Sequence, residues 1–377
     1  MHKEKVLVPE LRFSEFEVDW DLFPFEHIVK YVKSGKSKRE KNGIYNLYGS
    51  TGIIGKTNDF ITEGSYLLVA RVGANAGQIN FVKGKFGVSD NTLIISFKDD
   101  IKIGFVKDFL IQFDLNRLVF GSGQPLVTGG LLKKIKVAIP ISEEQQKIAN
   151  FLTSIDNQIQ TLEKKKTLLE QYKKGVMQKI FKQELRFKDD EGGEFSNWKL
   201  KRIGEVFKER NEKNFTDMEL LSVSISKGIY PQSESNKKDN SNSDKSKYKR
   251  VLKDDIAYNS MRMWQGASAV SDYDGIVSPA YTILKGNEYQ YSIFYGYLFK
   301  MSFMIKTFQK HSQGLTSDTW NLKYPMISKI KINIPSLEEQ IKIANFLLAI
   351  DKNIALVNTK IEQTKSYKKG LLQQMFV

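Results

Sequence analysis

Residues 131–181 read LLKKIKVAIPISEEQQKIANFLTSIDNQIQTLEKKKTLLEQYKKGVMQKIF, and residues 326–376 read MISKIKINIPSLEEQIKIANFLLAIDKNIALVNTKIEQTKSYKKGLLQQMF. The two stretches align without a gap at an offset of 195, with 24 identities in 51 positions. A shorter repeat lies upstream, where Glu10–Phe13 and Glu184–Phe187 both read ELRF and a tryptophan follows each. The chain is therefore a tandem duplication, in which each half is a globular region followed by the same tail.

The shared tail predicts a short strand, a proline stop and a long helix. Apolar residues alternate before the proline of each tail, which is the period of a β-strand. Acidic residues follow each proline, where the N-terminus of a helix favours negative charge. The spacings from Ser142 to Gln145 and from Ser336 to Glu339 are those of a capping box. We therefore expect a helix to begin just after each proline.

Both predicted helices carry heptad repeats. Apolar residues recur every 3.5 residues over about five heptads, which indicates a coiled-coil seam. The predicted seam contains Ile148, Leu152, Ile155, Ile159 and Leu162 in the first helix, and Ile343, Leu347, Ile350, Ile354 and Val357 in the second. Lys166, Lys173 and Lys368 also fall on it. The helices can pair within one chain or between the chains of a homodimer, and covalent linkage favours the first arrangement.

The two globular regions do not match each other in sequence. Both contain short β-branched and aromatic runs that are broken by Gly, Asn and Asp, a pattern typical of mixed α+β domains rich in turns. The predicted division of the chain is a first head at 1–142, a first helix at 143–182, a second head at 183–335 and a second helix at 336–377.

Composition narrows the classes of function. The chain has 377 residues, enough for two or three domains, and its 41% hydrophobic content excludes a wholly disordered chain. It has no cysteine and three histidines, which argues against disulfides, thiolate zinc sites and a cysteine nucleophile. Neither a secretion signal nor a membrane span is visible, so we expect a cytoplasmic protein without membrane contact. The formal net charge of +15 suggests a polyanionic partner, although 49 of the 58 basic residues are lysines, which often only solvate a surface.

Short segments of the chain resemble parts of catalytic motifs, but no motif is complete. Gly55-Lys56-Thr57 resembles the end of a P-loop, but Ser50 stands where the first glycine is required. Ser278–Tyr281 resembles the Asp/Asn-Pro-Pro-aromatic motif of amino-methyltransferases without its second proline, and Phe120–Gly123 resembles a glycine turn for S-adenosylmethionine. A nuclease would need a Pro-Asp pair, which the chain lacks. We expect no catalytic, cofactor-binding or metal-binding residue; a stand-alone DNA adenine methyltransferase is the alternative, and a coiled-coil adaptor is a third possibility.

The candidate nucleic-acid contacts lie in the heads. DNA readers need phosphate contacts for position and base-edge contacts for identity. Arg71 in VARVGANAG and Arg262 in NSMRMWQG have room to approach a groove and pair with guanine, although each is equally suited to hydrogen bonds inside a turn. The full set of candidates is Lys36, Lys38, Arg39, Lys56, Arg71, Asn75, Gln78, Gln124, Lys247, Asn259, Arg262, Trp264, Gln265 and Gln313 beside Gly314.

The doubled tail, IP-x-x-EEQ-x-KIANFL-x-x-ID with YKKG toward each helix end, resembles the conserved regions of type I restriction–modification specificity subunits. The first head's YGSTGIIG, GVSDN and GSGQP, and the second head's YNSMRMWQG and VSPAY, resemble target recognition domains of that family. The resemblance covers nearly the whole chain. It implies an α+β protein, with two mixed α/β target recognition domains in pseudo-twofold tandem, separated by two long helices that form an antiparallel coiled coil.

The same resemblance implies a non-catalytic subunit whose partners supply the chemistry. Each target recognition domain would read one half of a bipartite, asymmetric site in double-stranded DNA. Two modification (methyltransferase) subunits would carry S-adenosylmethionine, and two restriction subunits would add translocation and cleavage that depend on ATP and Mg. The implied chain holds no cofactor of its own.

Overall fold

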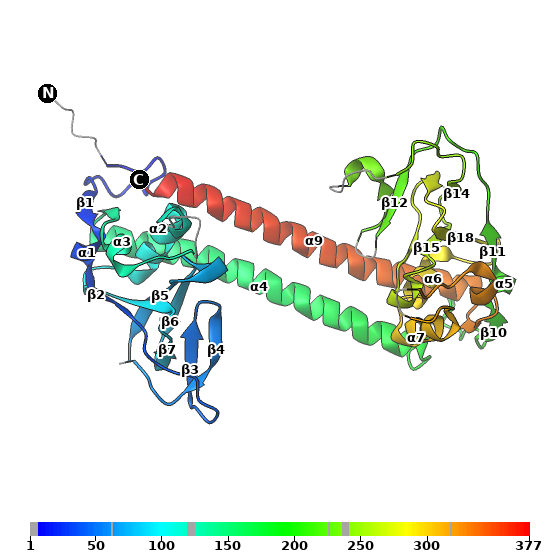
Figure 1. Cartoon of the computed structure of the whole chain (residues 1–377), viewed down its shortest axis with the longest axis horizontal. Coiled ribbons are helices and arrows are strands. Elements are labelled where there is room, and N and C mark those ends of the chain that lie inside the picture. Colours follow the sequence, from blue (N-terminus) through cyan, green and yellow to red (C-terminus); the bar gives the residue numbers. More distant parts are fainter. Residues whose placement is uncertain (1–6, 62, 119–124, 225–226, 236–240, 317–318) are drawn as a thin grey trace. The chain divides into compact units, whose positions relative to one another are not determined.

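The computed structural model describes residues 7–61, 63–118, 125–224, 227–235, 241–316 and 319–377 (Figure 1). The chain divides into two compact units. Unit 1 consists of Met1–Lys166 and Leu356–Val377, and unit 2 consists of Thr167–Ala355. Each unit contains one head and one part of each long helix, so the duplicated sequence folds into two units of like composition.

The shared tails form two long helices, α4 (Ser142–Phe181) and α9 (Leu337–Met375). In unit 1 the start of α4 packs against the end of α9, where Leu152 and Met375 belong to one apolar cluster. In unit 2 the end of α4 packs against the start of α9, where Ile180 and Leu347 share a second cluster. The two helices of one chain therefore pair in antiparallel fashion within each unit, as the heptads and the family resemblance predicted.

A short strand precedes each long helix, as the alternation of apolar residues predicted. Strand β9 (Lys136–Ile139) pairs with β1 (Asp21–Pro24), and β19 (Lys331–Ile334) pairs with β10 (Lys199–Arg202), both in antiparallel fashion. Because β1 and β10 come from the beginning of each head and β9 and β19 from its end, each pair closes its head at the base.

The predicted capping boxes are wrong in most respects. At the first helix the Gln145 N–H donates to the Ile141 carbonyl at 3.1 Å and not to the Ser142 side chain. Ser336 Oγ does accept a hydrogen bond from the Glu339 N–H, at 3.4 Å. The side chains that should reach back to the cap have other partners: the Glu339 carboxylate accepts from Arg186, and the Gln145 amide donates to the Pro140 carbonyl at 2.9 Å. Both side chains are buried under the head, so tertiary contacts use them in place of the helix terminus.

Head 1 is built on a four-stranded antiparallel sheet. Its strand order is β2 (Val29–Ser34), β8 (Thr92–Phe97), β5 (Ser65–Ala70) and β6 (Ile79–Lys83). A second sheet contains β4 (Gly52–Thr57), β3 (Tyr45–Gly49) and β7 (Phe86–Val88), and the helices are α1 (Phe25–Ile28), α2 (Ile103–Phe113) and α3 (Gly129–Lys133). Alternate residues of β5 face opposite cores: Leu67 and Val69 pack with α2, and Leu68 packs toward the second sheet.

Head 2 has a four-stranded sheet of the same order. The strands are β11 (Phe207–Arg210), β18 (Tyr281–Gly286), β15 (Ile256–Asn259) and β16 (Ser268–Val270). Two further antiparallel pairs are β12 (Leu221–Ser224) with β13 (Gly228–Pro231), and β14 (Lys249–Val251) with β17 (Gly275–Val277). The helices are α5 (Ile203–Val206), α6 (Ser292–Leu298), α7 (Ser302–His311) and α8 (Tyr324–Ile327).

The two heads therefore share one topology although their sequences do not match. Each begins with a base strand and a one-turn helix, places its first and last long strands side by side, and returns through a short helix to the second base strand. Alternating apolar residues specify such a sheet without requiring particular side chains. The mixed α+β architecture predicted for the heads is confirmed.

Two negative findings apply to the described residues. No helix among them is long and apolar enough to cross a membrane. In the same part of the chain, no group of three or more histidine, aspartate and glutamate side chains is placed to hold a metal ion.

Candidate nucleic-acid interface

In head 1 the chain turns between β5 and β6, and this connection contains the 3-10 turn Gly73–Asn75. We call this connection, and its counterpart between β15 and β16 in head 2, the outward turn. Arg71 begins this turn, and its Nη1 donates to Ser34 Oγ at 2.8 Å and to the Asp90 carbonyl at 3.1 Å. The guanidinium is thus committed in part to holding neighbouring segments of its own head. Asn75 and Gln78 follow on the same turn, and Gln78 is exposed.

The basic candidates of head 1 form a separate exposed group beside the β3–β4 hairpin. Lys36, Lys38 and Arg39 lie in the segment after β2 and are exposed. Lys56 lies on β4, and its Nζ donates to Asn46 Oδ1 at 2.8 Å. These positions suit phosphate contact rather than base reading, because a flexible lysine provides charge with little directional selectivity.

In head 2 the corresponding turn connects β15 to β16 and contains the 3-10 turn Met263–Gln265. Arg262 is exposed, and its guanidinium has no hydrogen-bond or ion-pair partner among the described residues. Asn259, by contrast, uses its Oδ1 to accept from the Met261 N–H at 3.0 Å, which shapes the turn. Gln265 is exposed at the end of the turn.

Trp264 fixes the orientation of the turn in head 2. Its Nε1 donates to the Met261 carbonyl at 3.0 Å, and its ring meets that of Trp320 edge-on, with centroids 5.2 Å apart. The backbone adds a further link, because the Leu322 N–H donates to the Ser260 carbonyl at 2.8 Å. The sequence motifs YNSMRMWQG and HSQGLTSDTW, about fifty residues apart, therefore lie side by side.

The second of these motifs carries the last candidate of head 2. Gln313 is exposed, and its backbone pairs with that of Asn321. Leu315, two residues later, is fully exposed at 101%. Sequence reasoning passed over Leu315; the available signal was a large apolar residue within a polar segment that also contains glycine.

The equivalent segment of head 1 contains Gln124, which lies outside the described residues. Just after it, Leu126 forms an isolated bridge with Val72, and the Val127 N–H donates to the Arg71 carbonyl at 2.8 Å. Val127 and Leu322 are 195 residues apart, the offset of the tail repeat. In each head, therefore, the segment that precedes the last short helix packs against that head's own outward turn.

Lys247 is set apart from the turn of head 2. It is exposed and lines a polar cavity of about 600 Å³ together with Tyr230, Ser278 and Tyr281. The segment that resembled a methyltransferase motif has local partners here: Ser278 Oγ accepts from the Ala280 N–H at 3.4 Å, and the Tyr281 hydroxyl donates to the Val223 carbonyl at 3.2 Å. These bonds account for the motif as a turn that leads into β18.

The predicted seam residues are placed mostly in the interior of the helix pair. The buried ones are Ile148, Leu152, Ile155, Ile343, Leu347, Ile350 and Val357, and Ile159, Leu162 and Ile354 are partly buried. The lysines of the seam have polar partners on the opposite helix. Lys166 Nζ donates to Asn358 Oδ1 at 2.6 Å in unit 1, and Lys173 Nζ donates to Asp351 Oδ1 at 2.5 Å in unit 2.

In unit 1 the seam also contains a charged cluster. Lys368 of α9 donates to Asp156 of α4 at 2.6 Å and to the fully buried Asp108 of α2 at 3.3 Å, and Lys107 lies close to both carboxylates. Burial raises the pKa of Asp108, against the attraction of Lys107 and Lys368. Burial opposes ionisation of Asp156 as well, but hydrogen bonds from Lys368 and Lys107 outweigh it and lower its pKa. The cluster ties head 1 to both long helices.

The ELRF repeat is explained by a buried ion pair at the start of each long helix. Arg12 makes two hydrogen bonds to Glu144, both at 2.8 Å, and Arg186 makes two to Glu339, at 3.1 and 2.7 Å. Glu339 also accepts from Trp198 Nε1 at 3.1 Å. The opening segment of each head is thus anchored to its helix by the planar, two-pronged contact that arginine favours.

Comparison with known proteins assigns the family. The model described as "Type I restriction modification DNA specificity domain" matches residues 17–171 and 195–366. The type I restriction enzyme MjaVIII specificity subunit of Methanocaldococcus jannaschii is 26% identical over an alignment 396 positions long, which covers 94% of this chain and 91% of that protein. The type I restriction enzyme EcoprrI specificity subunit of Escherichia coli is 29% identical over 154 residues, 39% of this chain and 38% of that protein.

Solved structures support the same fold. The crystal structure of a type I restriction–modification system S subunit from M. genitalium matches with a TM-score of 0.65 at 16% identity, covering 98% of this chain and 99% of that one. A chain from a structural study of complex assembly in the type I R-M system matches with a TM-score of 0.53 at 13% identity, covering 94% and 97%. Specificity subunits are the non-catalytic DNA-recognition components of type I systems. The chain belongs to this family and carries two copies of the type I restriction–modification DNA specificity domain.

Proposed function

We propose that each head of this specificity subunit reads one half of a bipartite, asymmetric site in double-stranded DNA. The observation that carries the proposal is the pair of outward turns, β5–β6 in head 1 and β15–β16 in head 2. They lie at equivalent positions of two sheets with the same strand order, and their side chains differ. A common scaffold with different residues at the equivalent turn suits two readers of different sequences. The exposed guanidinium of Arg262 suits a guanine edge, for which arginine is the commonest partner.

We also propose that the helix pair sets the gap between the two half-sites and that the chemistry belongs to partners. Each long helix contributes residues to both units. Two modification subunits would supply S-adenosylmethionine, and two restriction subunits would act with ATP and Mg. The complex would work in the cytoplasm. The comparisons give no support to the alternative of a stand-alone adenine methyltransferase.

The first test is selection from a randomised duplex library, using the full chain bound to the modification subunits of its own system. We expect two short conserved blocks, unlike each other and separated by a fixed gap. Affinity should fall steeply with salt, because phosphate contacts release counterions. A single block would contradict two-headed reading, and methyl transfer from labelled S-adenosylmethionine by the chain alone would favour the alternative.

The second test removes one heptad from each helix, residues 163–169 of α4 and 355–361 of α9. Whole heptads preserve the seam, so the helices should still pair. Seven residues correspond to about 10 Å of helix, or about three base pairs of DNA. The selected gap should therefore shorten by about three base pairs while both blocks remain unchanged. An unaltered gap would refute the idea of a helical spacer.

A further inference from the structure

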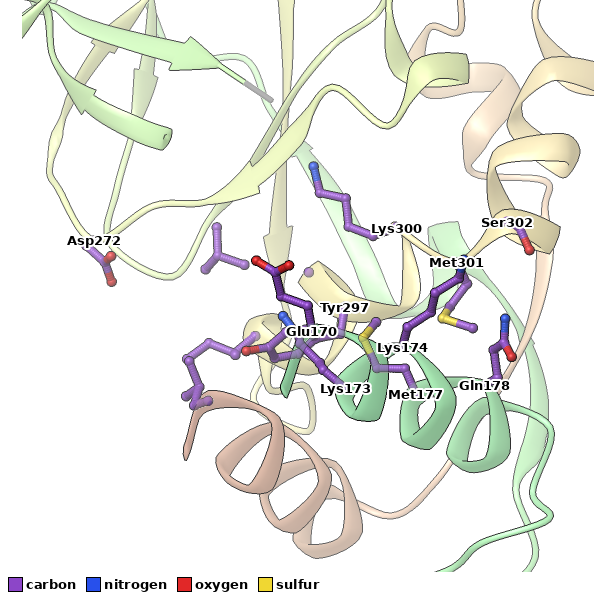
Figure 2. Close-up of a pocket in the computed structure, with 14 residues that line it drawn as sticks. Glu170, Lys173, Lys174, Met177, Gln178, Asp272, Tyr297, Lys300, Met301 and Ser302 are labelled. Atoms are coloured by element: carbon purple, nitrogen blue, oxygen red, sulfur yellow. The ribbon is translucent and has the colours of Figure 1, made fainter. Parts of the chain in front are cut away.

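Lys300 holds the outward turn of head 2 from behind. It lies just after the end of α6, and its Nζ donates to the carbonyls of Gly266 at 2.5 Å and Ser268 at 2.7 Å. Burial lowers the pKa of this lysine, and no carboxylate lies within ion-pair distance of it among the described residues. Figure 2 shows the side chain at the edge of a cavity, with its nitrogen directed away from the sulfur atoms of Met177 and Met301. Removing an ammonium group from water is unfavourable, so the two backbone carbonyls are needed to compensate for the partial burial of Lys300.

The two carbonyls stand where the turn closes. Gly266 has a φ of 80°, a left-handed conformation in which the chain reverses. Between the two carbonyls, Ala267 pairs with both ends of the turn: its N–H donates to the Arg262 carbonyl at 3.2 Å, and its carbonyl accepts from the Asn259 N–H at 2.9 Å. Lys300 therefore fixes the closing point of the segment that displays Arg262, Trp264 and Gln265.

Helix α6, which leads into Lys300, is itself fastened to both long helices within unit 2. Tyr297, one turn earlier, donates its hydroxyl to Asp351 of α9 at 2.7 Å. Lys173 of α4 binds the same carboxylate and lies 4.9 Å from the centroid of the Tyr297 ring. A cavity of about 640 Å³ is lined by Lys173, Tyr297 and Lys300 (Figure 2). A continuous set of polar contacts thus runs from the helix pair through α6 to the turn.

Head 1 closes its equivalent turn differently. Gly77, with a φ of 87°, packs directly on Leu115 and the Asn116 backbone, and a Cβ atom there would lie 3.1 Å from Leu115 Cβ. No lysine side chain donates to the carbonyls of this turn in the described part of head 1. The contact made by Lys300 is accordingly a feature of head 2.

We propose that Lys300 is a positioning residue for DNA reading by head 2, acting through the Gly266 and Ser268 carbonyls on the turn that carries Arg262. The proposal rests on the proposed reading function. It makes Lys300 a determinant of sequence discrimination although its ammonium binds backbone carbonyls of the turn.

The test compares Lys300→Met, Lys300→Arg and Lys306→Met in the full chain bound to its modification subunits. Methionine keeps the apolar stem and removes the ammonium, whereas arginine keeps donors for both carbonyls. Lys306 is exposed on the neighbouring α7, so its replacement is a control with the same change in charge. Binding is measured on the selected duplex and on duplexes altered in one half at a time, and amide hydrogen exchange is measured over residues 259–268.

Lys300→Met should reduce discrimination about tenfold at one half-site only, the half that Arg262→Met also affects. Exchange over 259–268 should become faster, Lys300→Arg should restore most of both properties, and Lys306→Met should resemble the unaltered chain. Unchanged discrimination with Lys300→Met, or equal loss at both halves, would overturn the proposal. If the unaltered chain itself discriminates at neither half, the reading function fails instead, and the exchange data alone then decide whether Lys300 holds the turn.

Discussion

Each head has its own four-stranded sheet, and the outward turn lies at the equivalent position in both. The contacts that hold the turn differ between the two heads. In head 1, Arg71 is bound to Ser34 and the Asp90 carbonyl, and Gly77 packs on Leu115. In head 2 the Arg262 guanidinium has no partner among the residues that the structure describes, and Lys300 binds the two carbonyls where the turn closes. A duplicated scaffold can therefore keep its topology while different side chains support the equivalent turn in each copy.

The bases of the heads differ in a smaller way. Glu144 has Arg12 as its partner, while the Nε1 of Trp20 is buried without a partner among the described residues. In unit 2 the equivalent carboxylate of Glu339 binds both Arg186 and Trp198. The unit 2 contact is therefore less dependent on a single arginine.

The largest expected effect comes from removing those arginines. Arg12→Met should lower the free energy of unfolding of unit 1 by about 3–5 kcal/mol, because it leaves a buried carboxylate without its partner. Arg186→Met should cost unit 2 about 1 kcal/mol less, since Trp198 still donates to Glu339. Urea unfolding of each variant measures both values, with Arg12→Met combined with Glu144→Gln as the control that should recover part of the loss. If Arg12→Met and Arg186→Met lowered the unfolding free energy equally, the contact from Trp198 to Glu339 would not have the stabilising role given to it.

Replacing the interhelical acids should give a smaller loss of unfolding free energy, and one that depends on pH. Asp156→Asn should cost about 1.5–3 kcal/mol at pH 7 by removing charged hydrogen bonds. The pKa of Asp156 is lowered in the folded state, so its contribution is complete above the unfolded value of about 3.9 and disappears as pH falls through the folded value. The gap between the variant and the unaltered chain should therefore narrow below about pH 4.

Asp351→Asn is the matched change in unit 2, where the carboxylate side chain is 40% exposed. It should cost about 1 kcal/mol or less at pH 7, because solvent screens the pair. Urea unfolding between pH 3 and pH 7 measures both variants. A cost for Asp156→Asn that stays constant over this range would contradict the role given to the ionised carboxylate.

The glycines that close the outward turns offer a smaller contrast. Gly77→Ala should cost about 2–3 kcal/mol, because strain from the left-handed backbone adds to a 3.1 Å contact with Leu115. Gly266→Ala should cost about 1 kcal/mol, since its added Cβ atom would meet the flexible end of Ile305 at 3.4 Å. Thermal unfolding provides the measurement. Gly52→Ala, with a φ of 93° and no neighbour within 4 Å, reports the backbone strain alone.

The smallest effect on stability is expected from the arginines of the outward turns. Arg71→Met should cost about 1–2 kcal/mol through its lost hydrogen bonds, whereas Arg262→Met should change stability by less than about 0.5 kcal/mol. Discrimination at one half-site should show the reverse order, with Arg262→Met losing about 1–3 kcal/mol. Unfolding curves and binding to singly altered duplexes measure the two effects. A marked loss of stability with Arg262→Met would identify that arginine as structural.

The scaffold could be predicted from the sequence because it is periodic and repeated. The alternation before each proline specifies β9 and β19, and the heptads specify α4, α9 and their buried seam. The common topology of the heads was not visible, since sheets accept many apolar side chains at each inward position. The capping boxes predicted at Gln145 and Glu339 were wrong for a related reason. The spacing is a local pattern, whereas burial beneath each head gives both side chains other hydrogen-bond partners.

The candidate site was predictable only as a set of segments. Glycine-rich turns with arginine, asparagine and glutamine identified the β5–β6 and β15–β16 turns. Sequence alone could not tell that Arg71 binds Ser34 and the Asp90 carbonyl whereas Arg262 has no partner in the described part of head 2. Lys300 carried no signal at all, because its partners are backbone carbonyls that have no sequence signature. Whether any candidate touches a base or a phosphate stays a prediction.

The division of the chain has a consequence for its synthesis. Unit 1 is discontinuous, because Leu356–Val377 must join residues that were made 190 or more positions earlier. At about 5–20 residues per second, translation of the intervening stretch takes on the order of 10–40 s. Throughout that interval the first half of α4 lacks its partner helix, and the apolar cluster that contains Ile148 and Leu152 lacks Leu371, Leu372, Met375 and Phe376. Unit 2, by contrast, can close as a continuous segment. Unit 1 is therefore completed only when Leu356–Val377 joins it, and until then the apolar surface that this segment covers is open to aggregation.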